Sequence, residues 1–149
     1  TILRPGYITQ AMFEEAIGKT IIDPAIMGSL KEGVIPKAPG MKYKHYAPNA
    51  DVTIVEGPHE KVVQYINRQV SEKEAEGHRC AVMATDETKD KYICNDELSV
   101  ARNLYAILRD FDKQKVEYVY SESFETKNVG QAVMNRLIKA AGHKIVKLD

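Results

Sequence analysis

Apolar side chains recur with two different periods along the last hundred residues. Short runs rich in β-branched residues predict strands at 51–57, 79–85, 91–96, 116–123 and 143–148. Between them, apolar positions three and four residues apart predict helices at 58–77, 97–115 and 128–142. The alternation predicts an α/β fold: a three-layer Rossmann-like domain whose mostly parallel sheet of about five strands has helices on both faces.

The helical stripes also predict which side chains form the core. On the three helices these are Val62, Val63, Ile66, Val70, Leu98, Ala101, Leu104, Tyr105, Leu108, Phe111, Val129, Ala132, Val133, Leu137 and Ala140. Pro58 suits the start of the first of these helices, and Gly77 suits its C-terminal cap.

The first 48 residues do not show this alternation of strand and helix patterns. Thr9 is placed to cap a short helix at 10–18, whose apolar face (Met12, Phe13, Ala16 and Ile17) needs a partner that the segment itself does not supply. We therefore expect residues 1–23 to be the C-terminal remnant of another domain, so that the chain is a piece of a longer protein. The same unpartnered face suggests self-association of the isolated chain.

Composition narrows the class of protein without naming a function. Hydrophobic residues make up 44% and charged residues 28%, and the formal net charge is zero, which is typical of a globular domain with no overall attraction to nucleic acid or membranes. Cys80 lies in an apolar run and is expected in the core, and the two cysteines form no C-x-x-C pair. This usage, with no long apolar run, favours the cytoplasm.

Motifs with chemical meaning are few. None of the nine glycines forms a G-x-G or a phosphate loop, so dinucleotide binding is not predicted, and the four histidines are too scattered to predict a metal site or a catalytic triad. Ligands of open α/β sheets bind beyond the carboxyl ends of the strands, here 57–59, 85–88 and 121–128. The third loop, with Ser121, Ser123 and Thr126 before Asn128, suits either an anion or ordinary helix capping.

The segment 24–50 is predicted to be an extended linker. It contains PKAPGMKYKHYAP at 36–48, where alternation would place Met41, Tyr43 and His45 on one side and Lys42, Lys44 and Tyr46 on the other. Thirteen extended residues span roughly 40 Å, enough to cross the face of a small domain. Tyrosines and a methionine favour a docked, functional segment, while a solvated basic tether is the alternative.

These residues resemble a known family. APGMKYKHYAP resembles the interdomain linker of two-domain threonylcarbamoyl-AMP synthases, and ILRPGYIT (2–9) resembles the end of their YrdC-like catalytic domain. NLYAILRDFD (103–112) and GQAVMNRLIKAA (130–141) resemble segments of their Rossmann-like C-terminal domain. The resemblance covers essentially the whole chain and implies three parts: a catalytic-domain remnant (1–23), a linker that acts as a lid (24–50) and an accessory domain (51–149).

The resemblance implies an activity for the intact protein. Such enzymes are nucleotidyltransferases that form threonylcarbamoyl-adenylate and pyrophosphate from L-threonine, bicarbonate and ATP, with Mg²⁺ expected, and the product serves threonylcarbamoyladenosine modification of tRNA. Arg4 and His45 would contact ATP or substrate, and no catalytic residue is assigned in this chain.

The resemblance also implies that Met41, Lys42, Tyr43 and Tyr46 form the lid. Motifs upstream of Thr1 would be needed for activity, so the 149 residues alone are expected to be inactive and to hold no cofactor tightly. The alternative is a non-catalytic α/β module that binds a small anion, nucleotide, protein or tRNA.

Overall fold

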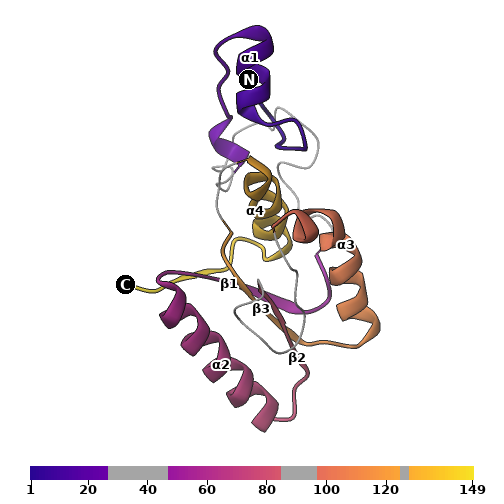
Figure 1. Ribbon diagram of the computed structural model, residues 1–149. Coiled ribbons are helices and arrows are strands. Elements are labelled where there is room, and N and C mark those ends of the chain that lie inside the picture. Colours follow the sequence, from indigo (N-terminus) through magenta and orange to yellow (C-terminus); the bar gives the residue numbers. More distant parts are fainter. Residues whose placement is uncertain (27–46, 85–96, 125–127) are drawn as a thin grey trace, which may run out of the picture.

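Within the described residues, a four-stranded parallel sheet forms the centre of the molecule (Figure 1). The computed structural model describes residues 1–26, 47–84, 97–124 and 128–149. The strands are β1 (Asp51–Glu56), β2 (Cys80–Met83), β3 (Tyr118–Glu122) and β4 (Ile145–Lys147), and they lie in the order β2-β3-β1-β4. All pairs are parallel, with Val52 opposite Val119 and Ile54 opposite Ile145. The α/β fold is therefore confirmed, and the fifth predicted strand, at 91–96, lies outside the described residues.

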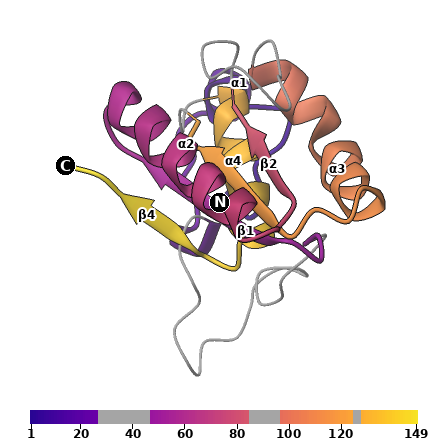
Figure 2. The same cartoon turned by 90° about the horizontal axis from the view of Figure 1, so that it is seen from below.

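Helices cover both faces of this sheet, as predicted. They are α2 (His59–Ala75) on one face and α3 (Glu97–Lys113) with α4 (Asn128–Ala140) on the other (Figure 2). Val52 and Ile54 point to the α3 and α4 side, whereas Val55 points to α2, because successive side chains of a strand face opposite ways. Of the predicted helical core, Val62, Ile66, Leu104, Leu108, Phe111, Ala132, Val133, Leu137 and Ala140 are buried, and the side chains of Leu98, Ala101 and Val129 lie outside the described set.

The strand order follows from the direction of each crossover. The chain passes from β1 over α2 to the edge strand β2, and then returns over α3 to β3, which lies between them. It continues over α4 past β1 to β4. When the chain reverses its direction across the sheet after β2, the connecting helix also moves to the other face. This is required because all parallel crossovers have the same hand. Cys80, expected in the core, is only half-buried, and β2 lies at an edge of the described sheet.

Helix ends follow local backbone chemistry. After α2, Gly77 has a φ of 90°, and the His78 N–H donates to the Lys73 carbonyl at 3.0 Å, closing a Schellman motif as the sequence predicted. Helix α3 closes in the same way at Lys115, with a φ of 55° and the Val116 N–H donating to Phe111 at 2.9 Å. A lysine in this left-handed conformation was not predicted, because glycine is the usual residue there.

The N-terminal segment projects from the sheet domain beyond α4 (Figure 1). It holds helix α1 (Gln10–Ile17), where the Thr9 hydroxyl accepts from the Met12 N–H at 3.3 Å, so the predicted cap is confirmed. No residue of α1 is buried. The exposed fractions of Tyr7 (80%) and Ile17 (75%) agree with an apolar face that has no partner within the described residues. Among those residues, no helix is long and apolar enough to span a bilayer.

Candidate functional site

Arg4 is the one predicted site residue that the structure describes. His45 and the predicted lid residues Met41, Lys42, Tyr43 and Tyr46 lie outside the described residues. The Arg4 side chain is exposed, and the next residue, Pro5, is buried. The N-terminal segment is tied together just before Arg4, where the Ile2 N–H donates to the Ile21 carbonyl at 2.7 Å. Arg4 therefore extends from a locally fixed backbone.

The same segment is anchored to the sheet domain by a short 3-10 helix, η1 (Pro24–Ile26). Ile26 is 2% exposed, and its carbonyl accepts a hydrogen bond from the Asn135 side-chain amide on α4. Asn135 is itself 4% exposed, so this amide has no water to replace the bond. The contact joins the N-terminal segment to α4, and it positions the residue after which the linker continues.

The other end of the linker is also fixed to the sheet domain. The Asn49 N–H donates to the Asp112 carboxylate on α3 at 2.7 Å. Ala50, the residue that follows, is 3% exposed within the core beside α3 and α4. Residues 26 and 49, which lie near the two ends of the predicted lid (24–50), are thus both held by the same helical layer of the domain.

Positive charge gathers where the N-terminal segment meets α4. Arg136 and Lys139 lie three residues apart on α4, so they share one face of the helix. The pKa of the Lys139 ammonium is below its usual range, first because the group is partly buried and then because the charges of Arg4 and Arg136 repel its own. Arg4 and Arg136 therefore both act electrostatically on Lys139.

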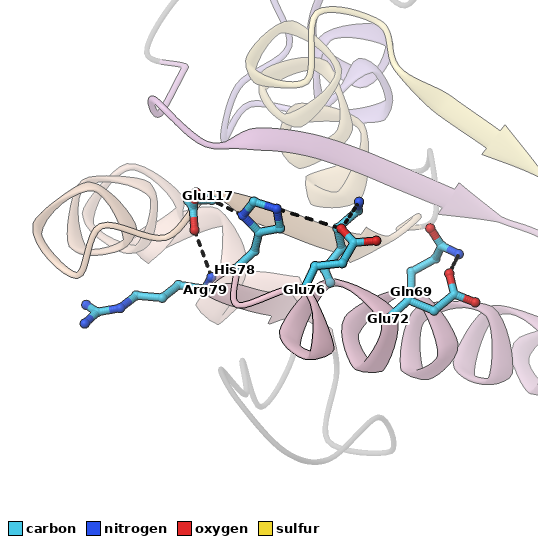
Figure 3. A network of polar contacts seen from close by, with 7 residues as sticks. Gln69, Glu72, Glu76, His78, Arg79 and Glu117 are labelled. Atoms are coloured by element: carbon cyan, nitrogen blue, oxygen red, sulfur yellow. Dashed lines mark hydrogen bonds and ion pairs between the residues drawn. The ribbon is translucent and has the colours of Figure 1, made fainter.

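A second polar cluster lies at the far end of the sheet, where β2 and β3 begin (Figure 3). His78 Nδ1 donates to Glu117 Oε1 at 3.1 Å, and the Arg79 backbone N–H donates to Glu117 Oε2 at 3.1 Å. Glu76 lies on the other side of the His78 ring, with its carboxylate 3.8 Å from Nε2. The pKa of Glu117 is lowered, first by the Arg79 N–H and then by the His78 ring.

The lowered pKa of Glu117 makes a testable contribution to stability. Because the folded-state pKa is the lower one, the stabilisation is present above the ordinary pKa of glutamate and is lost as the pH falls through the folded-state value. We expect Glu117→Gln to lose less stability than the wild type on acidification, measured by urea unfolding at a series of pH values. In His78→Gln, NMR titration should find the Glu117 pKa higher than in the wild type yet still lowered, because the Arg79 N–H remains. An unchanged Glu117 pKa in that variant would contradict the assignment.

Other chemistry is sparse in the part of the chain described by the structure. No group of three or more His, Cys, Asp or Glu side chains is arranged there to hold a metal ion. Tyr120 is buried against α2, and burial raises the pKa of its phenol to about 12, so it stays protonated at neutral pH. The junction of the N-terminal segment with α4 is therefore the candidate site.

Comparison with known proteins identifies the family. The model of the family described as "Threonylcarbamoyl-AMP synthase, C-terminal domain" matches residues 8–142. The chain belongs to this family. The match extends from the N-terminal segment through the linker to the end of α4, so it includes the α4 side of the candidate site, whereas Arg4 lies just before it.

Curated relatives carry the corresponding enzyme name. The threonylcarbamoyl-AMP synthase of Pyrococcus abyssi is 40% identical over 150 residues, which cover 99% of this chain and 44% of that protein. The enzyme of Bacillus subtilis is 37% identical over 155 residues, which cover 98% of this chain and 43% of that protein. The chain thus spans less than half the length of the curated relatives it matches.

Solved structures of family members have the same fold. Pyrococcus abyssi Sua5 in complex with L-threonine superposes with a TM-score of 0.85 at 39% identity, covering 99% of this chain and 44% of that one. A variant of the same protein, in which an adjacent histidine and tyrosine are both replaced by alanine, gives 0.84 at 38% identity, covering 98% and 42%. The separate C-terminal Sua5 domain of Pyrococcus horikoshii gives 0.54 at 40% identity, covering 68% and 100%.

The family resemblance seen in the sequence is therefore confirmed, whereas the roles of the individual site residues stay predictions. Sequence reasoning did not find Arg136, Lys139 or Asn135 as partners of the N-terminal segment. It assigned no role to His78, whose ring lies between two carboxylates. The i, i+3 spacing of Arg136 and Lys139 was the one available signal, and it is common on solvated helices.

Proposed function

We propose that this chain is the C-terminal part of a threonylcarbamoyl-AMP synthase. The intact protein would form threonylcarbamoyl-adenylate and pyrophosphate from L-threonine, bicarbonate and ATP, for threonylcarbamoyladenosine modification of tRNA. The observation that carries the proposal is that a relative named as this enzyme aligns with nearly the whole chain, linker included. Because the activity uses ATP and serves tRNA, we place it in the cytoplasm.

Three parts of the chain would have three roles. Residues 1–23 would complete the catalytic domain, 24–50 would form the lid, and 51–149 would be the accessory domain. A separately crystallised C-terminal domain in a relative supports an accessory domain that folds on its own. The anchors at Ile26 and Asn49 support a division in which the lid is held at both ends by the accessory domain.

Arg4 and His45 would contact the ATP phosphates. In the proposed reaction a carbamate oxygen of threonylcarbamate attacks the α-phosphorus of ATP, the bond from this phosphorus to the β-phosphate bridging oxygen breaks, and pyrophosphate leaves with the electron pair. Negative charge therefore grows on the leaving phosphates, where a guanidinium and a donating imidazole stabilise it. A bound Mg²⁺ would neutralise phosphate charge in the same step.

Met41, Lys42, Tyr43 and Tyr46 would cover the active site with His45. A lid suits this reaction because the carbamate is labile in water and because excluding water strengthens charge stabilisation. One solved variant of the Pyrococcus abyssi protein replaces an adjacent histidine and tyrosine. The present sequence contains one His-Tyr pair, His45-Tyr46, which supports the choice of these residues.

The 149 residues alone are expected to make no adenylate. No catalytic residue is assigned in them, and the relatives they match are more than twice as long. The assay incubates this chain with radiolabelled threonine, bicarbonate, ATP and Mg²⁺ and separates threonylcarbamoyl-adenylate by chromatography. The longer protein serves as the matched positive control, and its failure to form the adenylate would refute the proposed function. Adenylate formation by the 149 residues would instead refute the division of the chain.

A second candidate is a non-catalytic module that binds a small anion, nucleotide, protein or tRNA. The observation that favours it is the pair of cations on α4, a helix of the accessory domain. Titration of residues 49–149 and of the intact protein with ATP, AMP and tRNA separates the two functions. Full affinity in residues 49–149 favours the module, and binding confined to the intact protein favours the synthase.

A further inference from the structure

Three cations from distant parts of the sequence lie near the junction of the N-terminal segment with α4. Arg136 and Lys139 share a face of α4, and Asn135, which precedes Arg136, binds the Ile26 carbonyl. The Asp23 N–H, three residues before Ile26, donates to the Ile2 carbonyl at 3.0 Å, two residues before Arg4. Arg4 is therefore connected to this part of α4 by a short chain of hydrogen-bonded contacts.

The three side chains have no carboxylate partner in the part of the chain described by the structure. Elsewhere in the described residues, ion pairs join Arg68 to Glu72, Lys73 to Glu76, Lys144 to Asp51 and Lys147 to Glu56. Arg136 instead donates Nη1 to the Ala132 carbonyl at 3.1 Å and lies 6.0 Å from the ring centroid of Tyr105. Its guanidinium is oriented by its own helix and by an aromatic ring, and its other donors are left for another acceptor.

The surroundings of Lys139 disfavour its charged form. Its pKa is lowered by partial burial and then by the charges of Arg4 and Arg136. An anion bound among the three groups would offset both the burial and the repulsion. A guanidinium pair and an ammonium are well suited to phosphate oxygens, which accept several charge-assisted hydrogen bonds.

We propose that Arg4, Arg136 and Lys139 form one binding site for a phosphate chain, in which α4 supplies two of the three cations. The identity of the phosphate chain rests on the proposed function, in which the polyphosphate of ATP or the pyrophosphate product is the anion beside Arg4. The accessory domain then has a direct role, because it adds positive charge at the nucleotide phosphates and holds the segment that carries Arg4.

The experiment uses the 149-residue chain and inorganic pyrophosphate as the probe, followed by ATP and AMP, in ¹H–¹⁵N NMR titrations at low ionic strength. We expect saturable pyrophosphate binding with a dissociation constant of about 1 mM, because only part of the site is present. Amide shifts should be centred on residues 2–6 and 132–140, AMP should bind more weakly than ATP, and binding should weaken with added salt.

The decisive variant is Arg136→Gln/Lys139→Gln. We expect it to weaken pyrophosphate binding at least about tenfold, because two charge-assisted contacts are lost. The matched control is Arg102→Gln/Arg109→Gln, which removes two exposed arginines of α3 and should leave the dissociation constant within about twofold. Circular dichroism melting confirms that each variant is folded. Equal affinity in the α4 variant, shifts centred on α2, or no binding by the wild type would overturn the proposal.

The intact protein separates this proposal from the proposed function. If it forms the adenylate, the α4 variant should raise the KM for ATP and weaken inhibition by pyrophosphate, with kcat changed much less. If the intact protein forms no adenylate while the chain binds pyrophosphate through α4, the proposed function fails and the phosphate site stands. Adenylate formation with an unaltered KM and unaltered pyrophosphate inhibition in the variant overturns the phosphate site alone.

Discussion

Replacing Phe111 with alanine is expected to lower the free energy of unfolding by about 3–5 kcal/mol, a large part of the total for a domain of this size. Phe111 is 0% exposed and belongs to the core between the sheet and the layer of α3 and α4. Removing its ring both loses buried apolar contacts and leaves a cavity, because a packed core relaxes only partly. Its position at the end of α3 also places it beside the Schellman motif at Lys115.

Urea unfolding of the 149-residue chain, followed by far-UV circular dichroism, measures this loss. The matched control is Asn103→Ala, an exposed position on the same helix, for which we expect a change within about 0.5 kcal/mol. Phe111→Leu keeps most of the volume and should lose clearly less than the alanine variant. A loss below about 1 kcal/mol for Phe111→Ala would mean that the apolar side chains of α3 contribute little to the core.

This expectation is strong because the spacing of apolar residues along α3 correctly indicated its buried face. The spacing of Leu104, Leu108 and Phe111 alone indicated one buried face, and all three are buried. Local signals also sufficed at Thr9, whose hydroxyl caps α1, and at Gly77, whose positive φ closes α2. In each case the physical cause lies within a few residues, so the sequence displays it directly.

Features that depend on distant residues could not be obtained in this way. The order β2-β3-β1-β4 depends on which crossover passes over which strand, and no local pattern encodes it. His78 and Glu117 are 39 residues apart and meet because β2 and β3 are neighbours. Likewise, Lys115 adopts a left-handed conformation although the local preference is for glycine, because the Schellman hydrogen bonds and the adjoining core hold it there.

The candidate site also combines features seen in the sequence with features that only the fold reveals. Family resemblance selected Arg4 and the linker residues, but the surroundings of Arg4 required the fold. Asn135 anchors Ile26 and Asp112 anchors Asn49, so one layer of the accessory domain fixes a residue near each end of the linker. Fixing the ends of a segment reduces the conformational entropy that is lost when it docks. The accessory domain would therefore favour a closed lid even where it contacts no substrate.

That reasoning leads to an expected result for His45 in the intact enzyme. His45→Ala should lower kcat for adenylate formation by about 100–1000-fold, the range found when a donor to a developing charge is removed from a closed site. The thermal unfolding midpoint should change little, because the proposed role of His45 is contact with the substrate. Steady-state kinetics with separated threonylcarbamoyl-adenylate, together with calorimetric melting, measures both quantities.

His45→Gln and Tyr46→Phe separate charge stabilisation from simple coverage of the site. Glutamine keeps a hydrogen-bond donor without the imidazolium charge, so we expect its kcat to lie between those of the wild type and the alanine variant. Tyr46→Phe keeps the ring that would cover the site and should have the smallest effect. Equal losses of kcat in the glutamine and alanine variants would mean that His45 acts through a positive charge. A neutral hydrogen-bond donor would then give no advantage over alanine. Unaltered kinetics in His45→Ala would instead contradict the proposed contact of His45 with the ATP phosphates.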